Sequence, residues 1–178
     1  MRFHSKPTPD RAKVASMERM QIGARRALTK GEIALGRTLF ADEIAWDRVR
    51  VLQAPPLGFG AMAPFGGWIV FSHWRAARDF SHTPIGEQGW FVHELAHVWQ
   101  SAQGMFLPAL KLAAMGKRAY AYKARKTASF HQYNIERQAE IVRHLWLSRK
   151  GAHEANMPDA AWLEAMWAGR LKGRSRVV

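Results

Sequence analysis

Apolar residues recur at helical spacing in four segments of the chain, and this periodicity predicts four helices. In the first segment, Thr29 stands before the apolar run and Glu32 lies three positions later, which is the arrangement of a capping box at the start of a helix. In the second segment, apolar residues cover a broad face, and Gly104 is suited to end the helix. The last three predicted helices occupy residues 88–103, 133–147 and 158–168.

Two shorter segments have the pattern of β-strands. Residues 46–53 alternate valine with arginine, which predicts a strand with one buried face. Residues 67–72 form a second, mostly apolar run that also predicts a strand. Proline and glycine are concentrated between the two, and residues 54–67 are therefore predicted to form a loop. Longer connections are predicted for residues 72–86 and 104–132.

These elements predict an α+β protein that is mainly helical and has a short β-sheet. The chain has 178 residues, which is about the size of one domain. Hydrophobic residues make up 48% of it, enough to form a core. We expect one domain over residues 27–168, preceded by a basic, flexible N-terminal arm (residues 1–26) and followed by a basic tail (residues 169–178).

The composition restricts the chemistry that the chain can perform. It contains no cysteine, which excludes disulfides, thiol catalysis and cysteine-ligated metal sites, so any metal ion must be bound by histidine, aspartate or glutamate. No segment approaches the roughly 18 apolar residues of a membrane span, and the N-terminus lacks the apolar part of a secretory signal. The sequence thus predicts no membrane span and a cytoplasmic protein by default, with non-Sec export left open.

The basic charge of the chain suggests one alternative function. Lys and Arg number 27 against 14 Asp and Glu, a formal net charge of +13. Such an excess favours polyanions, and residues 117–126, in which Tyr120 and Tyr122 are interleaved with basic residues, have a pattern typical of nucleic-acid binding. The rest of the charge is spread along the chain as on an ordinary solvated surface, so we do not expect nucleic acid to be the partner.

The second predicted helix contains an HExxH motif at residues 93–97. His93 and His97 are four residues apart and lie on one face of a helix, with Cβ atoms about 6 Å apart, so both imidazoles can reach one Zn²⁺. Glu94 projects beside the metal, where it would take a proton from a water molecule that the metal activates. Apolar residues flank the motif on both sides, and chance pairs of surface histidines do not usually lie on such a buried helix.

A catalytic zinc site needs a third protein ligand and one open position. Gln100 and Gln103 occupy the positions where a metzincin would carry glycine and histidine, so the ligand must come from elsewhere. Glu136 and Glu140 lie four residues apart beside the apolar stripe of the third predicted helix, where they would repel each other unless a positive charge lay opposite. We expect Glu136 to be the ligand and Glu140 to accept the other ring N–H of a ligand histidine.

Alternatives to this ligand set stay open. The two glutamates could instead form a solvated pair screened by Arg137 and Arg143. His131 and His144 are reserve ligands, and His144 continues the stripe on which the glutamates lie. Peptide hydrolysis also needs a hydrogen-bond donor for the developing oxyanion, and His131 and Tyr133 are the first candidates because they lie just before the glutamates. Other tyrosines are available, but no pattern favours them.

Four segments carry a resemblance to a known family: residues 29–37 (TKGEIALGR), 49–51 (VRV), 93–100 (HELAHVWQ) and 133–142 (YNIERQAEIV). Together they look like the vgr-related, Rhs-element-associated proteins with a predicted zinc-metallopeptidase core. The likeness spans about residues 27–148. The chain is similar, more distantly, to the HExxH domain of extracellular contractile injection systems.

The resemblance implies a minimal zincin-like fold in which two core helices share the metal. It implies a gluzincin arrangement, with His93 and His97 as zinc ligands, Glu94 as the base, Glu136 as third ligand and Glu140 behind it. We therefore expect a zinc-dependent metallopeptidase that acts on a peptide or protein substrate. The first alternative is a non-catalytic zinc-containing module that assists a bacterial secretion or Rhs/Vgr-type system, and the second is a basic nucleic-acid-binding protein.

Overall fold

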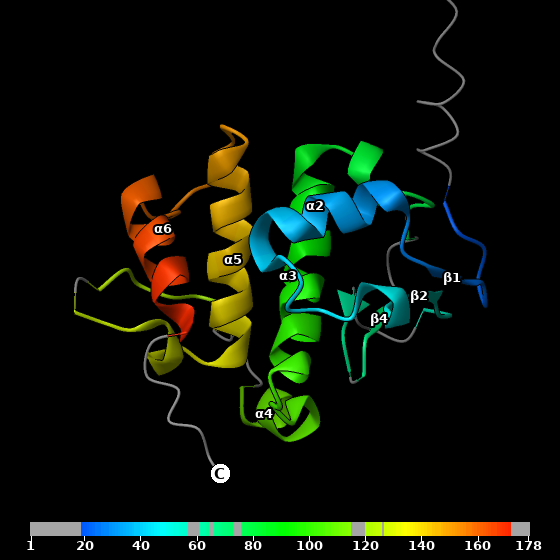
Figure 1. Cartoon of the computed structure of the whole chain (residues 1–178), viewed down its shortest axis with the longest axis horizontal. Coiled ribbons are helices and arrows are strands. Elements are labelled where there is room, and N and C mark those ends of the chain that lie inside the picture. Colours follow the sequence, from blue (N-terminus) through cyan, green and yellow to red (C-terminus); the bar gives the residue numbers. More distant parts are fainter. Residues whose placement is uncertain are drawn as a thin grey trace, which may run out of the picture.

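The computed structural model describes residues 19–56, 61–64, 66–72, 76–114, 120–125 and 127–171 of the chain. The helices are α2 (Lys30–Phe40), α3 (Ile85–Ala102), α4 (Leu107–Ala114), α5 (Ile135–Arg149) and α6 (Ala160–Ala168). The strands are β1 (Arg25–Ala27), β2 (Arg50–Gln53), β3 (Ala61–Met62) and β4 (Trp68–Phe71). In Figure 1, α6, α5 and α3 stand side by side, and the small sheet lies on the other side of α3 from α5. The mainly helical α+β architecture predicted from the sequence is confirmed.

The four strands form one mixed sheet in the order β1-β2-β4-β3. The central strands β2 and β4 are parallel, and each outer strand is antiparallel to its neighbour. Val51 and Ile69 pair in register and are both fully buried. The strand predicted for residues 46–53 is shorter than expected, because Trp46–Arg48 forms a 3₁₀ turn. In that turn the buried Trp46 donates its indole N–H to the carbonyl group of Ala41.

The capping box predicted at the start of α2 is confirmed. The Thr29 hydroxyl accepts a hydrogen bond from the Glu32 N–H (3.1 Å), and the Glu32 carboxylate accepts one from the Thr29 N–H (2.9 Å). Glu32 is buried and also accepts hydrogen bonds from the Arg26 guanidinium and from the Phe80 N–H. This one carboxylate therefore ties the start of α2 to β1 and to the turn that precedes α3.

The helix α3 lies at the centre of the molecule, and residues 91–100 of it are all buried. It packs against α5 and contacts β4. At its end Gly104 has a φ of +83°, the Gly104 N–H donates to Ser101, and the Met105 N–H donates to the carbonyl group of Gln100. These are the two hydrogen bonds of a Schellman motif. Because unpartnered polar groups are costly inside a protein, the polar residues of α3 must find partners on one another or on α5.

Most predicted helices agree with the structure, but two predicted connections are partly wrong. α3, α5 and α6 match the predicted ranges to within three residues at each end. Residues 104–132 were expected to be a connection but contain α4. Pro108 lies in the first turn of α4, where its missing N–H costs no helical hydrogen bond. The loop predicted for residues 54–67 contains the two-residue strand β3.

Parts of the predicted arm and tail lie outside the described residues, namely residues 1–18 and 172–178. Within the described part of the arm, Met20 is buried, and Arg25 and Arg26 belong to β1. No helix in the described part of the chain is both long enough and apolar enough to cross a membrane.

Candidate metal centre

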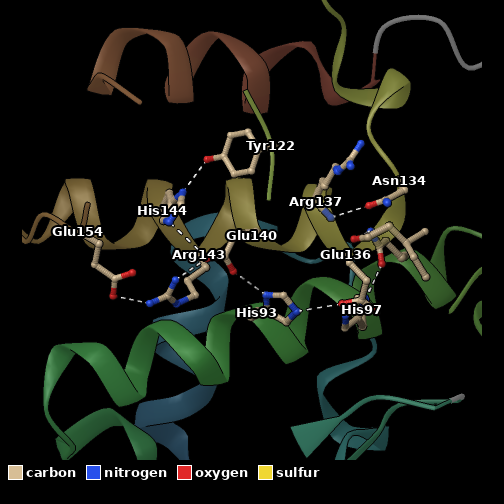
Figure 2. A network of polar contacts seen from close by, with 12 residues as sticks. His93, His97, Tyr122, Asn134, Glu136, Arg137, Glu140, Arg143, His144 and Glu154 are labelled. Atoms are coloured by element: carbon tan, nitrogen blue, oxygen red, sulfur yellow. Dashed lines mark hydrogen bonds and ion pairs between the residues drawn. The ribbon is translucent and has the colours of Figure 1, made fainter. Parts of the chain in front are cut away.

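Two helices bring three candidate ligands together in the interior of the domain (Figure 2). His93 and His97 come from α3, and Glu136 comes from the first turn of α5. Their exposed fractions are 2%, 0% and 7%. The side chain of Asn134 caps α5 by accepting a hydrogen bond from the Arg137 N–H (2.9 Å), and this cap sets where α5 begins and therefore where Glu136 lies.

The ligand atoms of these three residues converge on one point. Oε2 of Glu136 lies 3.4 Å from Nε2 of His93 and 3.1 Å from Nε2 of His97. The two imidazole rings have centroids 5.0 Å apart and are inclined at 81°. One ligand atom from each residue lies within 4.8 Å of the others. This His/His/Glu group, shared by two core helices, could bind a single metal ion.

The other ring nitrogen of each histidine also has a partner. Nδ1 of His93 lies 3.2 Å from Oε2 of Glu140, and Nδ1 of His97 lies 2.8 Å from Oε1 of Gln100. In both contacts an oxygen atom lies opposite Nδ1, while Nε2 of each histidine is turned toward Glu136. Histidines that bind metals usually make an outer contact of this kind, which fixes the ring orientation.

Glu140 is the centre of a polar network on the other side of His93 (Figure 2). Its Oε1 contacts the Arg143 guanidinium (2.5 Å) and Nε2 of His144 (3.3 Å). Arg143 is also ion-paired with Glu154, and the Tyr122 hydroxyl lies 2.6 Å from Nδ1 of His144. Ligand atoms of Glu140, His144 and Glu154 also lie within 4.8 Å of one another. Arg143 pairs with both carboxylates, however, and supplies the positive charge that they need.

The carboxylates around His93 favour a positive charge at the His/His/Glu group. Burial by itself lowers the pKa of His93, but hydrogen bonds with Glu136 and Glu140 and the charges of Glu94 and Glu140 raise it to about 9. Burial raises the pKa of Glu140, whereas the hydrogen bond and charge of His93 and the charge of Arg143 bring it below its ordinary value. A proton on His93 or a metal ion would provide this positive charge.

Glu94 is a buried carboxylate on α3 directly after His93. It is 4% exposed, and its Oε2 has no hydrogen-bond partner in the described part of the chain. A buried oxygen without a partner costs free energy, so this position suits a bound water or substrate group that donates to it. Two imidazoles, the Glu136 carboxylate and a neighbouring carboxylate with one unpartnered oxygen are groups that could form a hydrolytic metal site.

The two residues that the sequence suggests as oxyanion donors contact main-chain groups. Nε2 of His131 lies 2.6 Å from the carbonyl oxygen of Arg170. The Tyr133 hydroxyl donates to the carbonyl oxygen of Lys123 (2.8 Å). Either side chain would have to give up this hydrogen bond before it could donate to a substrate at the His/His/Glu group.

Tyr120 lies beside the group, although no sequence pattern favours it over other tyrosines. Its ring centroid is 5.7 Å from that of His93, and its side chain is 50% exposed. Partial burial and the charges of Glu136, Glu94 and Glu140 raise the pKa of the Tyr120 hydroxyl to about 12. The hydroxyl therefore keeps its proton at neutral pH and can donate it in a hydrogen bond.

The basic segment considered for nucleic-acid binding is described only for residues 120–125. Its residues 117–119 and 126 lie outside the described part. Tyr122 stacks on Trp162, with ring centroids 6.0 Å apart, and its hydroxyl contacts His144. Tyr122 thus packs within the domain, and Tyr120 lies beside His93, so neither observation favours a nucleic-acid surface.

Comparisons with known proteins find a similarity to a bacterial secretion-system protein. No protein-family model matches the chain. The chain is 31% identical over 142 residues to the type VI secretion system spike protein VgrG2b of Pseudomonas aeruginosa, a match that covers 75% of this chain but only 14% of VgrG2b. The structure is similar to that of the effector domain of P. aeruginosa VgrG2b, with a TM-score of 0.62, 29% identity and coverage of 89% of this chain and 92% of that domain. The resemblance to Vgr-related proteins is confirmed to this extent.

Proposed function

We propose that this chain, a homologue of the VgrG2b effector domain, is a metal-dependent peptidase. The observation that carries the proposal is the convergence of His93, His97 and Glu136 at one buried point. Glu94, next to His93 in the chain, has a carboxylate oxygen without a partner in the described part of the chain. Metal ligands and a free general base in one place are what water-mediated hydrolysis requires.

The metal would be held by Nε2 of His93, Nε2 of His97 and the carboxylate of Glu136. Two imidazoles and a carboxylate are the ligand set of hydrolytic zinc sites, and we propose Zn²⁺, although the same ligand types also bind Mn²⁺, Co²⁺ and Ni²⁺. When bound, the metal would act as a Lewis acid toward water and the substrate carbonyl group. The chain has no cysteine that would compete for the ion.

Glu94 acts as the general base and then as the general acid. Its free oxygen accepts a proton from the attacking water and afterwards delivers that proton to the amine that leaves the cleaved peptide bond. Glu94 as a whole is 4% exposed, so little bulk solvent reaches it.

Tyr120 acts on the substrate oxygen. As negative charge develops on the carbonyl oxygen during attack, the Tyr120 hydroxyl donates a hydrogen bond to it. Its half-exposed side chain can be reached by a substrate from solvent, and it lies next to His93. On this account His131 and Tyr133 stabilise the fold through their main-chain contacts.

The similarity to VgrG2b also suggests how the protein is used. VgrG2b is a type VI secretion system spike protein, and the similar part of it is an effector domain. We propose that this chain likewise serves as an effector domain of a type VI system, is exported by that route rather than by Sec, and cleaves a peptide or protein substrate. A non-catalytic module that carries the metal in the same setting is the alternative.

Two variants test this function. Glu94→Gln should retain the metal but lose peptide hydrolysis by about 10²-fold or more, because only the proton carrier is lost. Glu136→Ala should lose both metal and hydrolysis. Glu87→Gln is the matched control, since Glu87 lies on the same helix and is paired with Arg19 at the surface. Elemental analysis gives the metal content, and cleavage of an unstructured protein substrate gives the activity.

The outcomes distinguish the proposed function from its alternative. Metal in the wild-type chain without cleavage of any peptide would favour the non-catalytic module. Hydrolysis by Glu94→Gln at the wild-type rate would show that another group carries the proton. A wild-type chain that binds no metal would rule out both the peptidase and the non-catalytic module that carries a metal.

A further inference from the structure

His97 and Gln100 form a contact that the mechanism above does not use. Gln100 lies three residues after His97 on α3, and none of its surface is exposed. Its Oε1 is 2.8 Å from Nδ1 of His97. A glutamine amide can donate through its nitrogen or accept through its oxygen, so the effect of this contact depends on which way the amide is turned.

Main-chain carbonyl groups determine that orientation. Nε2 of Gln138 donates to the carbonyl oxygen of Tyr133 (2.8 Å), and Nε2 of Gln100 donates to that of Ile135 (3.0 Å). Because a carbonyl oxygen only accepts, each amide must turn its nitrogen toward it. The oxygen of Gln138 is then free to accept the second hydrogen bond from Nε2 of Gln100 (3.0 Å). Turning Gln100 over would break two buried hydrogen bonds, so its oxygen faces His97.

We propose that Gln100 and Gln138 are positioning residues that keep the proton of His97 on Nδ1 and thereby make Nε2 the metal ligand. The amide oxygen that faces His97 can only accept, so Nδ1 carries the hydrogen. Nε2 then presents its lone pair toward Oε2 of Glu136, 3.1 Å away. Two such acceptor atoms repel unless a positive charge lies between them, which is the arrangement that suits a bound cation. The inference rests on the metal site proposed above, but not on the peptidase activity.

The first test compares zinc affinities by competition with a chelator. Gln100→Leu removes the acceptor and should weaken zinc binding about 10–100-fold. Gln100→Glu keeps an acceptor for the Nδ1–H but loses both donated hydrogen bonds, so it should bind zinc at least as tightly as the wild type while its thermal stability falls. Gln88→Leu is the matched control, because Gln88 lies on the same helix and donates to the carbonyl groups of Ser81 and Thr83. It should lose stability but bind zinc normally.

These variants separate positioning from a general structural effect. If Gln100→Glu lost as much zinc affinity as Gln100→Leu, the loss would come from disturbed packing, and the proposal would be overturned. Wild-type affinity in Gln100→Leu would overturn it as well.

The second test needs no variant. In zinc-loaded protein labelled with ¹⁵N-histidine, Nδ1 of His97 should carry a slowly exchanging proton, and Nε2 should have the chemical shift of a metal ligand. Zinc bound to Nδ1, or a proton on Nε2, overturns the proposal.

The tests also distinguish this inference from the proposed function. Zinc binding with the expected pattern but without peptide hydrolysis would count against the peptidase and leave the inference standing. An active peptidase whose Gln100→Leu variant binds zinc normally would support the proposed function and overturn the inference about Gln100. A chain that binds neither zinc nor another divalent metal at this group overturns both.

Discussion

His93 and His97 approach the same carboxylate oxygen but have different partners on their outer sides. Glu140 gives His93 a charged partner, which favours a positive ring. Gln100 gives His97 a neutral one. A second charged partner would add another buried carboxylate to a group that already contains several, and each buried charge has a desolvation cost. The amide can orient His97 without that cost.

At the residue scale, the sharpest prediction concerns Tyr120. Tyr120→Phe removes the hydroxyl but keeps the ring beside His93, so kcat should fall about 10²–10³-fold, the usual loss of one oxyanion donor, while the metal content stays the same. Steady-state kinetics and elemental analysis of the same preparations measure both. Tyr133→Phe tests the other tyrosine and should lower stability rather than kcat, because that hydroxyl donates to a main-chain carbonyl group. A fall in kcat in Tyr133→Phe together with an unchanged kcat in Tyr120→Phe would assign the oxyanion donor to Tyr133.

The sequence predicts the candidate ligands better than the residues that support them. The four-residue spacing of His93 and His97 places them on one face of any helix, and Glu136 follows from a second periodic segment. The proposed role of Tyr120 depends on the path of an irregular segment, which periodicity does not specify. Gln100 lies three residues after His97 and so on the same helical face, and this spacing is the signal by which it could have been found.

At the element scale, small residues allow the helices around the site to pack closely. Gly89 of α3 faces α5, where an added Cβ would lie 3.2 Å from a methyl group of Leu147. Gly36 of α2 is closer still to its neighbours: an added Cβ would lie 2.5 Å from the Trp46 ring and 3.2 Å from a methyl group of Leu95. The close approach of α2 thus covers the part of α3 that precedes His97.

This packing makes Gly36→Ala destabilising, although alanine favours helices. The clash with the Trp46 ring should lower the free energy of unfolding by about 1–3 kcal/mol. The higher helix propensity of alanine would raise it by only about 0.5–1 kcal/mol. Gly86→Ala is the control, because no atom lies within 4 Å of an added Cβ there, and at the second residue of α3 it should stabilise the protein by at most about 0.5 kcal/mol. Urea unfolding measures both. An equal gain in the two variants would mean that α2 does not approach Trp46 this closely.

Element length explains only part of what the sequence predicts, since the four-residue strands β2 and β4 were also predicted. The 18 residues of α3 and the 15 of α5 repeat their apolar pattern over several turns, and both helices were predicted. The 8 residues of α4 and the 2 of β3 were missed, because each lies in a segment whose proline and glycine residues favour a loop. Short elements are specified by the partners against which they pack, which a periodicity does not reveal.

At the scale of the whole molecule, the candidate metal centre and the hydrophobic core share the same helices. His93 and His97 are about 40 residues from Glu136 in the chain, and only the packing of α3 on α5 brings them together. An unfolded chain presents no such group. A metal that binds here therefore binds the folded state and stabilises it by mass action.

Zinc should accordingly raise the melting temperature of the metal-free protein. At a free zinc concentration 100 times the Kd, the stabilisation is about 2.7 kcal/mol, which corresponds to roughly 5–11 °C for a chain of 178 residues. Differential scanning calorimetry before and after treatment with a chelator measures the shift. His97→Ala should melt at the same temperature with and without zinc, because it lacks one ligand. An equal shift in His97→Ala would place the stabilising ion elsewhere, with Glu140, His144 and Glu154 as the next group to examine.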